Sequence, residues 1–469
     1  MAALFPGGTD WMAAKIERTV ADSFSDMLWA ANMIKQPESS MDLRVLSQVR
    51  IASAVAAIIA AIGLPNADAQ PEGFNYDESG VPEFELPDPL ITEDGRRVDS
   101  VLVWEQVRRP EILRLFEHHV YGTLPDLIVR LRVRSHGVSR VLDGLALREQ
   151  QTVYLTDRDD GPSVDLLIYT PADAPLPVPA ILGLNFRGNH TVDADPDIRL
   201  PTSWVPNDKK QGIMDHRASE ASRGARARRW DIEAVVFRGY GLVTAYYGDV
   251  DPDYDDSFHN GIHQLAKTDR TAESGGSISA WAWGLSRILD TLETHPRVDG
   301  RRVAVFGHSR LGKTALWAGA TDERFRLVIS NNSGCGGAAL ARRRFGETVK
   351  RINTEFPHWF CRRHHEYNDR EDDLHVDQHQ LMALIAPRPV YVASAVNDVW
   401  ADPQGEMLSL FHASPVYALY GRTGLNSSAL PEPGQAVMKD VGYHIRPGRH
   451  DVTSYDWARY LDFADRHLR

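Results

Sequence analysis

One segment, the run from Val303 to Lys313, constrains the fold of this chain more than any other. The apolar residues 303–306 predict a short buried strand that ends at Gly307. Ser309 follows two residues later, and a helix is expected to begin near Gly312. This order is typical of a nucleophile elbow, in which a strand–turn–helix unit exposes a serine hydroxyl at the edge of a sheet. The general pattern has glycine two residues after the serine, where this chain has Leu311, so a plain turn beside a core strand is the alternative.

Strand-like and helical segments alternate around this turn. Buried strands are expected at 178–184, 242–246, 327–330 and 390–394, and helices at 277–293, 314–320, 375–385 and 454–468. Strand–helix alternation predicts a mostly parallel sheet with helices on both faces. We therefore predict the α/β-hydrolase fold, a three-layer αβα sandwich with a mostly parallel central sheet.

The N-terminal region has the pattern of a processing signal. Residues 51–64 form an unbroken apolar run that follows Arg44 and Arg50, and Ala67 and Ala69 form an A-x-A pair after it. We expect 1–40 to be an over-extended N-terminus, 41–69 a signal peptide, and 70–469 one catalytic domain of a secreted or periplasmic protein. The alternative is a buried helix at 51–64. No linker or repeat divides the rest of the chain, and 70–94 is expected to be extended.

A serine nucleophile needs a base, and the base needs an orienting carboxylate. In this fold the two partners follow the serine in the order acid, then histidine. Asp398 comes directly after the strand expected at 389–395, and Asp402 and Glu406 are its rivals farther along the chain. His450 lies in a polar loop before the last helix. His444 is its rival, in a stretch that is expected to be half-buried.

Several ordered motifs carry a resemblance to a known family. The chain resembles a carbohydrate esterase family 15 glucuronoyl esterase of the bacterial type, over essentially all of 70–469. The matching segments are 86–90 (LPDPL), 307–313 (GHSRLGK), 332–337 (NSGCGG), 343–347 (RRFGE), 356–360 (FPHWF), 376–379 (VDQH), 386–389 (APRP), 398–403 (DVWADP) and 443–451 (YHIRPGRHD). The resemblance implies hydrolysis of esters between the 4-O-methyl-glucuronate of xylan and lignin alcohols, without a cofactor or metal.

The resemblance also implies roles for individual residues. Ser309 is the implied nucleophile and His450 the general base. Arg310 is expected to stabilise the oxyanion, because a guanidinium near a developing negative charge acts strongly in a dry site. The further implied contacts are with the sugar: Lys313 and Glu347 bind its hydroxyls, and Trp400 forms a wall of the pocket.

The chain departs from the family pattern at two places. Many relatives carry a glutamate as the triad acid where this chain has Asn332, so Asp398 is expected to be the acid. Fungal relatives join two cysteines where this chain has His308 and Asp451, so that bridge is absent. Whether its two cysteines, Cys335 and Cys361, pair is left open.

Other features exclude or weaken rival functions. A net charge of −12 argues against nucleic-acid binding, and two cysteines exclude a disulfide framework. His375 and His379 have helical i, i+4 spacing, but the glutamate of a zinc-protease motif is missing, so no metal is expected. The run 342–344 (RRR) is expected to be ion-paired locally or to face the acidic sugar. We expect a monomer that does not bind membranes once the signal is removed.

Two other functions remain open. An acetyl xylan esterase, or another carbohydrate serine esterase of the same fold, would share Ser309, Asp398 and His450 but would not need a cation and hydroxyl binders for a sugar acid. A catalytically silent carbohydrate-binding protein would not need the intact set of three. Comparing benzyl glucuronate with an aryl acetate as substrates separates these readings.

Overall fold

The computed structural model describes residues 70–125, 127, 129–266 and 268–469. The predicted signal peptide and the residues before it lie outside the described residues. Residues 72–469 form one compact unit around a single ten-stranded sheet. The strands are β1 (Arg132–Val141), β2 (Ala146–Tyr154), β3 (Ser163–Pro171), β4 (Val178–Asn185), β5 (Gly241–Tyr246), β6 (Val298–His308), β7 (Leu327–Asn331), β8 (Val390–Ala395), β9 (Ala436–Met438) and β10 (Val441–Arg446).

The centre of the sheet is parallel and its two ends are antiparallel. The strand order is β1-β2-β3-β5-β4-β6-β7-β8-β10-β9, and every neighbouring pair from β5 to β10 is parallel. The pairs β1-β2, β2-β3, β3-β5 and β10-β9 are antiparallel. The predicted mostly parallel sheet is confirmed.

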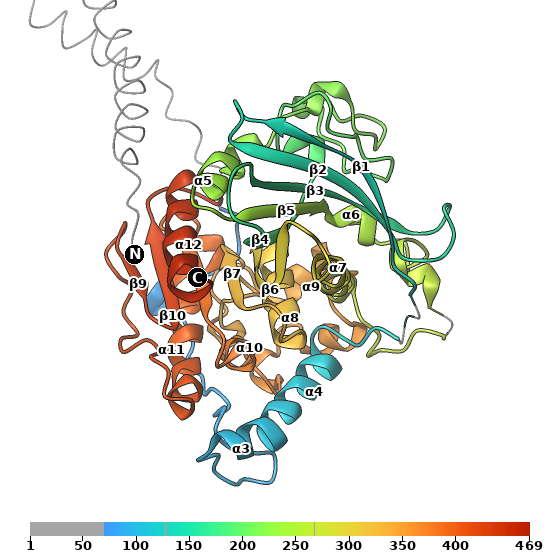
Figure 1. Ribbon diagram of the computed structural model, residues 1–469. Coiled ribbons are helices and arrows are strands. Elements are labelled where there is room, and N and C mark those ends of the chain that lie inside the picture. The colour runs from blue at the N-terminus through green and yellow to red at the C-terminus, as the bar shows by residue number, and fades with distance from the viewer. Residues whose placement is uncertain (1–69, 126, 128, 267) are drawn as a thin grey trace, which may run out of the picture. The chain divides into compact units, whose positions relative to one another are not determined.

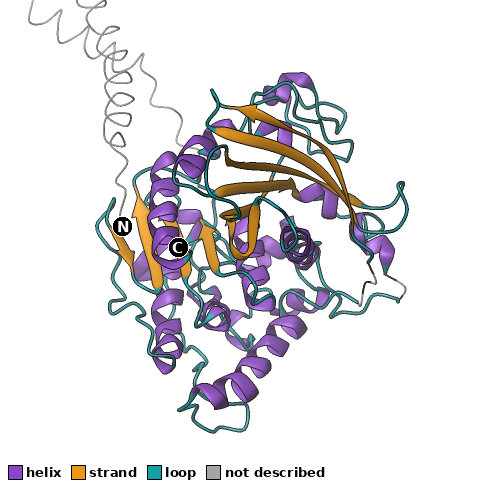
Figure 2. Cartoon of the chain, viewed as in Figure 1, coloured by secondary structure: helices purple, strands orange, loops and turns teal. Residues whose placement is uncertain are grey.

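Helices cover both faces of the sheet, which runs through the middle of the unit (Figure 2). The α-helices are α3 (Val101–Val103), α4 (Arg109–His119), α5 (Ile232–Phe237), α6 (Tyr247–Val250), α7 (Ser277–Leu292), α8 (Arg310–Thr321), α9 (Val349–Glu355), α10 (Gln378–Ile385), α11 (Pro403–Leu419) and α12 (Ser454–His467). In β6, Val303 and Val305 pack in the core that α7, α8, α10 and α11 share. Ala304 and Phe306 face the opposite core, which α5 and α12 cover. Alternate residues of one strand thus pack into the cores on the two faces of the sheet. The predicted three layers are confirmed (Figure 1).

Two helices begin at residues other than those predicted. α8 begins at Arg310, before the predicted start near Gly312, because the turn at Ser309 is sharp enough to lead straight into the helix. α10 begins at Gln378, three residues after the predicted start at His375. Asp377 caps this helix by accepting a hydrogen bond from the Gln378 backbone N–H at 2.8 Å. His375 therefore precedes the helix. The prediction that His375 and His379 lie one turn apart on the same helix was wrong.

The parallel strands β6, β7, β8 and β10 deliver polar residues to one edge of the sheet. Ser309 and Asn332 follow β6 and β7 directly, Asp398 comes three residues after β8, and His450 comes four residues after β10. Carboxyl ends of neighbouring parallel strands lie side by side, and this is where α/β folds build their sites. The fold therefore brings residues together that are up to 141 positions apart in the sequence, from Ser309 to His450.

Candidate active site

Ser309 stands at a strained turn between β6 and α8. Its φ of 58° and ψ of −130° are values that residues with a side chain rarely adopt. Gly307 makes the turn sterically feasible, since a Cβ there would lie 1.8 Å from the Leu311 carbonyl oxygen. Leu311 itself is buried in the core beneath the turn. The steric requirement for glycine thus lies before the serine, and the departure from the general pattern at Leu311 is accommodated.

Asp398 and His450 form an acid–base pair. His450 Nδ1 lies 2.6 Å from Asp398 Oδ2, although 52 residues separate the two in the sequence. The Asp398 side chain is 4% exposed, whereas that of His450 is 41% exposed. A proton on Nδ1, facing the carboxylate, leaves Nε2 as the ring's acceptor. The pair has the arrangement that a general base needs.

The elbow and the His450 ring lie next to each other. The rings of His308 and His450 are 4.5 Å apart between centroids, and His308 directly precedes Ser309. Burial, followed by the nearby His450, holds the pKa of His308 well below its usual range. His308 Nδ1 also bonds to Asn331 Oδ1 at 2.6 Å. A neutral, buried ring thus stands beside the predicted base where fungal relatives are expected to have a cysteine bridge.

Asn332 contacts Asp398, the predicted acid. Its Nδ2 donates to Asp398 Oδ2 at 2.7 Å, so this oxygen receives hydrogen bonds from both Asn332 and His450. Asn332 is buried and has a φ of 47°. The position where relatives are expected to carry a glutamate therefore lies beside the oxygen that contacts His450, and here it supplies a hydrogen-bond donor to Asp398.

The rival acids and the rival base all have structural partners. Asp402 pairs with Arg343 at 2.8 Å and caps α11. Glu406 is fully buried, and burial raises its pKa to about 8. It accepts hydrogen bonds from the Ser394 hydroxyl at 2.6 Å and from the Ser333 backbone N–H at 2.7 Å. His444 is fully buried rather than half-buried, and lies 2.9 Å from Asp456.

Arg310 is held by a carboxylate that the sequence pattern did not indicate. Its guanidinium forms an ion pair with Asp253, whose side chain is 3% exposed. The centroid of the Trp359 ring lies 4.5 Å from the Arg310 guanidinium carbon, and the Phe356 ring lies 5.2 Å from it. Cation–π contacts of this kind attract the guanidinium to the faces of the two rings.

Asp253 collects four side-chain donors. Besides Arg310 it accepts hydrogen bonds from Tyr247 Oη at 2.8 Å, His358 Nε2 at 2.9 Å and Trp359 Nε1 at 2.7 Å. Burial alone would raise the pKa of Asp253, but Arg310, His358 and Trp359 outweigh it and hold this pKa well below its usual range. Asp253 is therefore an ionised carboxylate fixed beside Arg310. No motif marked it, because it lies in a loop far from 307–313.

The predicted sugar contacts gather beside these residues. Lys313 is 4% exposed, donates to the Ser333 carbonyl, and lies 3.8 Å from Glu347 Oε2. Burial lowers the pKa of Lys313 and raises that of Glu347, although the charges of Lys313 and Arg310 favour the ionised Glu347. The Trp400 backbone carbonyl accepts a hydrogen bond from the Glu347 backbone N–H at 3.1 Å. The Trp400 ring packs edge-on against the Phe74 ring, with 5.0 Å between the two centroids.

The remaining sequence patterns have structural partners. His379 bonds to the Pro87 carbonyl at 2.8 Å, and the described residues contain no group of three ligands that could hold a metal ion. Each arginine in 342–344 pairs with carboxylates, which confirms that the run is ion-paired locally. Cys335 and Cys361 are both free, so they do not pair with each other. Within the part of the chain that the structure describes, no helix is long and apolar enough to cross a bilayer.

The strand order and the position of Ser309 between β6 and α8 define an α/β-hydrolase fold. Residues 258–421 match the family model described as "Glucuronyl esterase, fungi". Carbohydrate esterase MZ0003, from an unknown prokaryotic organism, is 53% identical over 408 residues, which cover 86% of this chain and 94% of that protein.

Solved structures agree with this match. A structure of a promiscuous CE15 esterase from a marine bacterial metagenome is 52% identical, with a TM-score of 0.80, and the match covers 84% of this chain and 100% of that one. The glucuronoyl esterase from Solibacter usitatus is 44% identical, with a TM-score of 0.78, over 82% and 99% of the two chains. The chain belongs to carbohydrate esterase family 15, and it is a carboxylic ester hydrolase.

Proposed function

We propose that this enzyme is a glucuronoyl esterase that hydrolyses esters between (4-O-methyl-)glucuronate of xylan and lignin alcohols. The observation that carries this proposal is the buried Lys313–Glu347 pair beside Ser309 and Arg310. Buried polar groups of both signs suit a substrate whose ring carries several hydroxyls, and they discriminate strongly against a substrate that leaves them unpaired. Similarity to the Solibacter usitatus glucuronoyl esterase supports the same substrate class.

In the proposed first half-reaction, Ser309 Oγ attacks the ester carbonyl while His450 Nε2 takes the hydroxyl proton. The imidazolium that forms is stabilised by Asp398 at its Nδ1 side, 2.6 Å away. The tetrahedral oxyanion then collapses, the bond to the alcohol oxygen breaks, and His450 returns the proton to that oxygen. The products of this step are the free alcohol and a glucuronoyl ester on Ser309.

In the second half-reaction, water attacks the acyl-enzyme and His450 accepts its proton. Collapse of the second tetrahedral intermediate returns that proton to Ser309 Oγ and releases the sugar acid. Arg310 stabilises the oxyanion in both steps through its backbone N–H and its guanidinium. Asp253, which is itself buried, fixes the guanidinium in place, so no reorganisation is needed as the negative charge develops.

A broader ester specificity is the second candidate, because the 52% identical structure is described as that of a promiscuous esterase. Such an enzyme would cleave simple acetyl esters with the same Ser309, Asp398 and His450. It would gain nothing from Lys313 and Glu347, whose partners belong to an intact sugar acid. The two candidates therefore differ in how strongly the reaction depends on this pair.

A substrate comparison tests the proposal. Purified enzyme is assayed on benzyl glucuronate and on an aryl acetate, together with the variants Glu347→Gln and Lys350→Gln. Lys350 lies three residues after Glu347 and is exposed, so Lys350→Gln is the control for a substitution outside the pair. We expect Glu347→Gln to lower kcat/KM on benzyl glucuronate by at least about tenfold, since an unpaired buried group costs roughly 1–3 kcal/mol. Unchanged kcat/KM on both substrates would favour the broader esterase, because such an enzyme gains nothing from this pair.

We also propose that the protein is exported, that the mature chain starts at Gln70, and that it acts as a monomer. The apolar run at 51–64 and the alanines that follow it support export. N-terminal mass mapping of the exported protein tests the cleavage site, and retention of Met1 or Met41 on it would contradict the proposal.

A further inference from the structure

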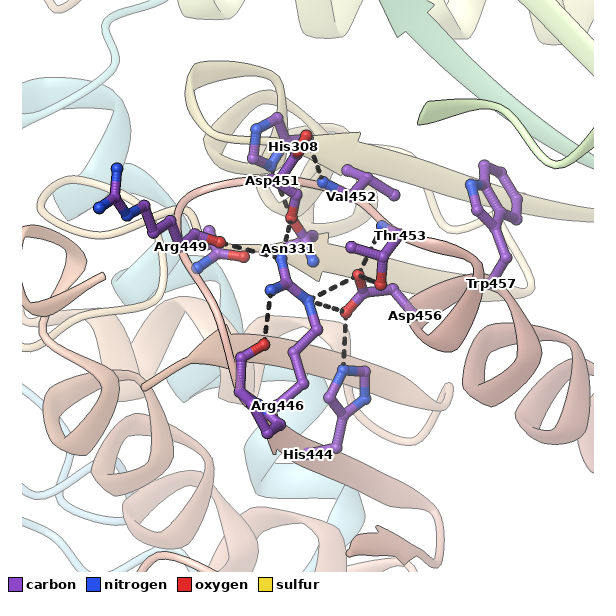
Figure 3. A network of polar contacts seen from close by, with 12 residues as sticks. His308, Asn331, His444, Arg446, Arg449, Asp451, Val452, Thr453, Asp456 and Trp457 are labelled. Carbon is purple, nitrogen blue, oxygen red and sulfur yellow. Dashed lines mark hydrogen bonds and ion pairs between the residues drawn. The ribbon is translucent and has the colours of Figure 1, made fainter. Parts of the chain in front are cut away.

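The loop that carries His450 converges on one buried guanidinium. Arg446, the last residue of β10, is 4% exposed. Its Nη1 donates to the Pro447 carbonyl at 3.2 Å, and its Nη2 donates to the carbonyls of Arg449 at 3.1 Å and of Asp451. The two residues that flank His450 in the sequence are thus held by the same nitrogen, as Figure 3 shows.

Arg446 is itself fixed from behind. Its Nε donates to both carboxylate oxygens of Asp456, at 3.0 and 2.8 Å, and Asp456 has no exposed surface. Asp456 also accepts a hydrogen bond from the Thr453 backbone N–H at 2.7 Å. Burial would raise the pKa of Asp456, but His444 and Arg446 outweigh it and hold this pKa below its usual range. The carboxylate therefore stays charged and keeps the guanidinium in one orientation.

The loop also joins the two halves of the acid–base pair. The Arg446 carbonyl accepts a hydrogen bond from the Val396 backbone N–H at 2.9 Å, and the Gly448 carbonyl accepts one from Asn397 at 2.9 Å. Both donors directly precede Asp398. On the outer side, Asp451 forms ion pairs with Arg228 and Arg229, each at 2.6 Å.

The exposure of His450 makes this backbone support necessary. With 41% of its side chain exposed, His450 has too little packing around it to be fixed by contacts alone. Gly448, with a φ of 107°, adds freedom to the loop. Only a side chain with several donors in a rigid fork can bind a carboxylate on one side and three carbonyls on the other.

We propose that Arg446 is a positioning residue for His450, and that its hydrogen bonds to the loop carbonyls hold the imidazole in line with Asp398 and Ser309. The proposal rests on the proposed role of His450 as the general base. A misplacement of about 1 Å at a reacting group lowers the rate by about a hundredfold.

The test compares Arg446→Lys with Arg388→Lys. Arg388 is a matched control because it is also buried and also donates to three carbonyls, those of Gly319, Asp322 and Phe325. It lies just before β8, at the end of that strand opposite Asp398. Lysine keeps the positive charge in both variants and removes the fork.

We expect Arg446→Lys to lower kcat by about a hundredfold with KM within a few-fold of the wild type, since substrate contacts are unchanged. Arg388→Lys should match its loss in melting temperature but keep kcat within about twofold of the wild type. Equal kcat values for the two variants, or a loss confined to KM, would overturn the proposal.

An NMR measurement reports the position of the His450 ring separately from the folding of the protein. The proton between His450 Nδ1 and Asp398 Oδ2, at a nitrogen–oxygen distance of 2.6 Å, should give a strongly deshielded ¹H NMR signal in the wild type and in Arg388→Lys. The signal should broaden or shift in Arg446→Lys, and an unchanged signal in a folded variant would overturn the proposal.

Gly448→Ala provides a second route if Arg446→Lys does not fold. A Cβ at Gly448 would lie 3.0 Å from Arg446 Nη1, and alanine is strained at its φ of 107°, so the change disturbs both the contact and the loop backbone without opening the core. It should lower kcat and alter the same NMR signal, and wild-type values of both would overturn the proposal. All variants are assayed on benzyl glucuronate and on an aryl acetate. If only the aryl acetate is cleaved by the wild type, the glucuronate proposal fails, while the effect of Arg446 is still measured.

Discussion

The proposed nucleophile and the proposed base of this enzyme are held by different forces. Ser309 stands on a turn whose shape is dictated by steric exclusion, because Gly307 leaves no room for a side chain against the Leu311 carbonyl. His450 stands on a half-exposed loop whose shape is dictated by hydrogen bonds to Arg446 and ion pairs of Asp451. Close packing tolerates little change in volume, whereas a polar network tolerates changes in size but not the loss of a donor. The two regions should therefore fail in different ways.

The largest effect is expected from removing the nucleophile itself. Ser309→Ala should lower kcat by about a millionfold, the scale seen when a serine hydrolase loses its nucleophile, while binding of free glucuronate survives. The Lys313–Glu347 pair does not depend on the serine hydroxyl. The measurement is kcat on benzyl glucuronate together with calorimetric binding of glucuronate. Activity within a few-fold of the wild type would make Ser309 a turn residue only.

The acid should show the next largest effect. Asp398→Ala should lower kcat by about ten-thousandfold, because the imidazole of His450 loses its orienting anion. Adding Asn332→Glu should recover at least about tenfold, or roughly 1.4 kcal/mol, since Asn332 already contacts the oxygen that receives His450. The measurement is kcat for both variants, with folding checked by circular dichroism. A double variant as inactive as the single one would show that a glutamate at 332 does not reach His450.

Arg310 tests whether the elbow region also supplies charge. Arg310→Ala should lower kcat by about a hundredfold or more with a much smaller change in KM, as for other oxyanion donors. Asp253→Asn, which leaves Arg310 in place without its carboxylate, should cost less, about tenfold. Steady-state kinetics on both variants separates the contribution of the Arg310 guanidinium from that of the carboxylate that holds it. A pure KM effect for Arg310→Ala would make it a ground-state ligand of the sugar acid.

Gly307→Ala tests whether steric exclusion fixes the turn at Ser309. The added Cβ would overlap the Leu311 carbonyl, and such overpacking costs about 1–3 kcal/mol. We expect a lower denaturation midpoint together with reduced activity, so that stability and kcat fall in parallel. Gly434→Ala is the contrasting variant, because the space around Gly434 is open and only its φ of 88° opposes a side chain, whereas Gly307 has no positive φ. We expect Gly434→Ala to leave kcat unchanged, and a Gly307→Ala variant with wild-type stability and kcat would mean that the contact at Leu311 does not control the elbow.

The outer ion pair of the His450 loop should show the smallest effect. The Arg228 side chain is 70% exposed, and exposed ion pairs contribute about 0–1 kcal/mol. Arg228→Gln should leave kcat within about twofold of the wild type and should show little dependence on added salt. A tenfold loss would mean that the loop is held from outside as much as by Arg446.

Local sequence was sufficient for the elements built on a single pattern. The strands β4 and β5 and the helices α7 and α12 lie within a residue of their expected bounds, because each follows a clear apolar period. The start of α10 was misplaced, since His375 and Val376 continue the polar–apolar pattern and only the Asp377 cap stops it. β1, β2 and β3 were not expected at all. Charged residues interrupt β1 and β2, so neither strand shows a simple apolar alternation, whereas the apolar run at 166–169 in β3 was a signal that went unused.

The sequence determined the order of serine, acid and histidine along the chain and the strands that precede the first two, because the sheet topology places strand ends at a common edge whatever the loops contain. The strand before His450 was not expected. The structure alone decided which polar residues in those loops meet. Asp402 and Glu406 follow the same strand as Asp398 and carry the same kind of side chain. They bind Arg343 and Ser394, however, whereas Asp398 binds His450. Asp253 beside Arg310, and Arg446 beneath His450, arise from contacts whose partners are set by packing over many segments. Hydrogen bonds act over about 3 Å, so no one-dimensional pattern specifies them until the chain has folded.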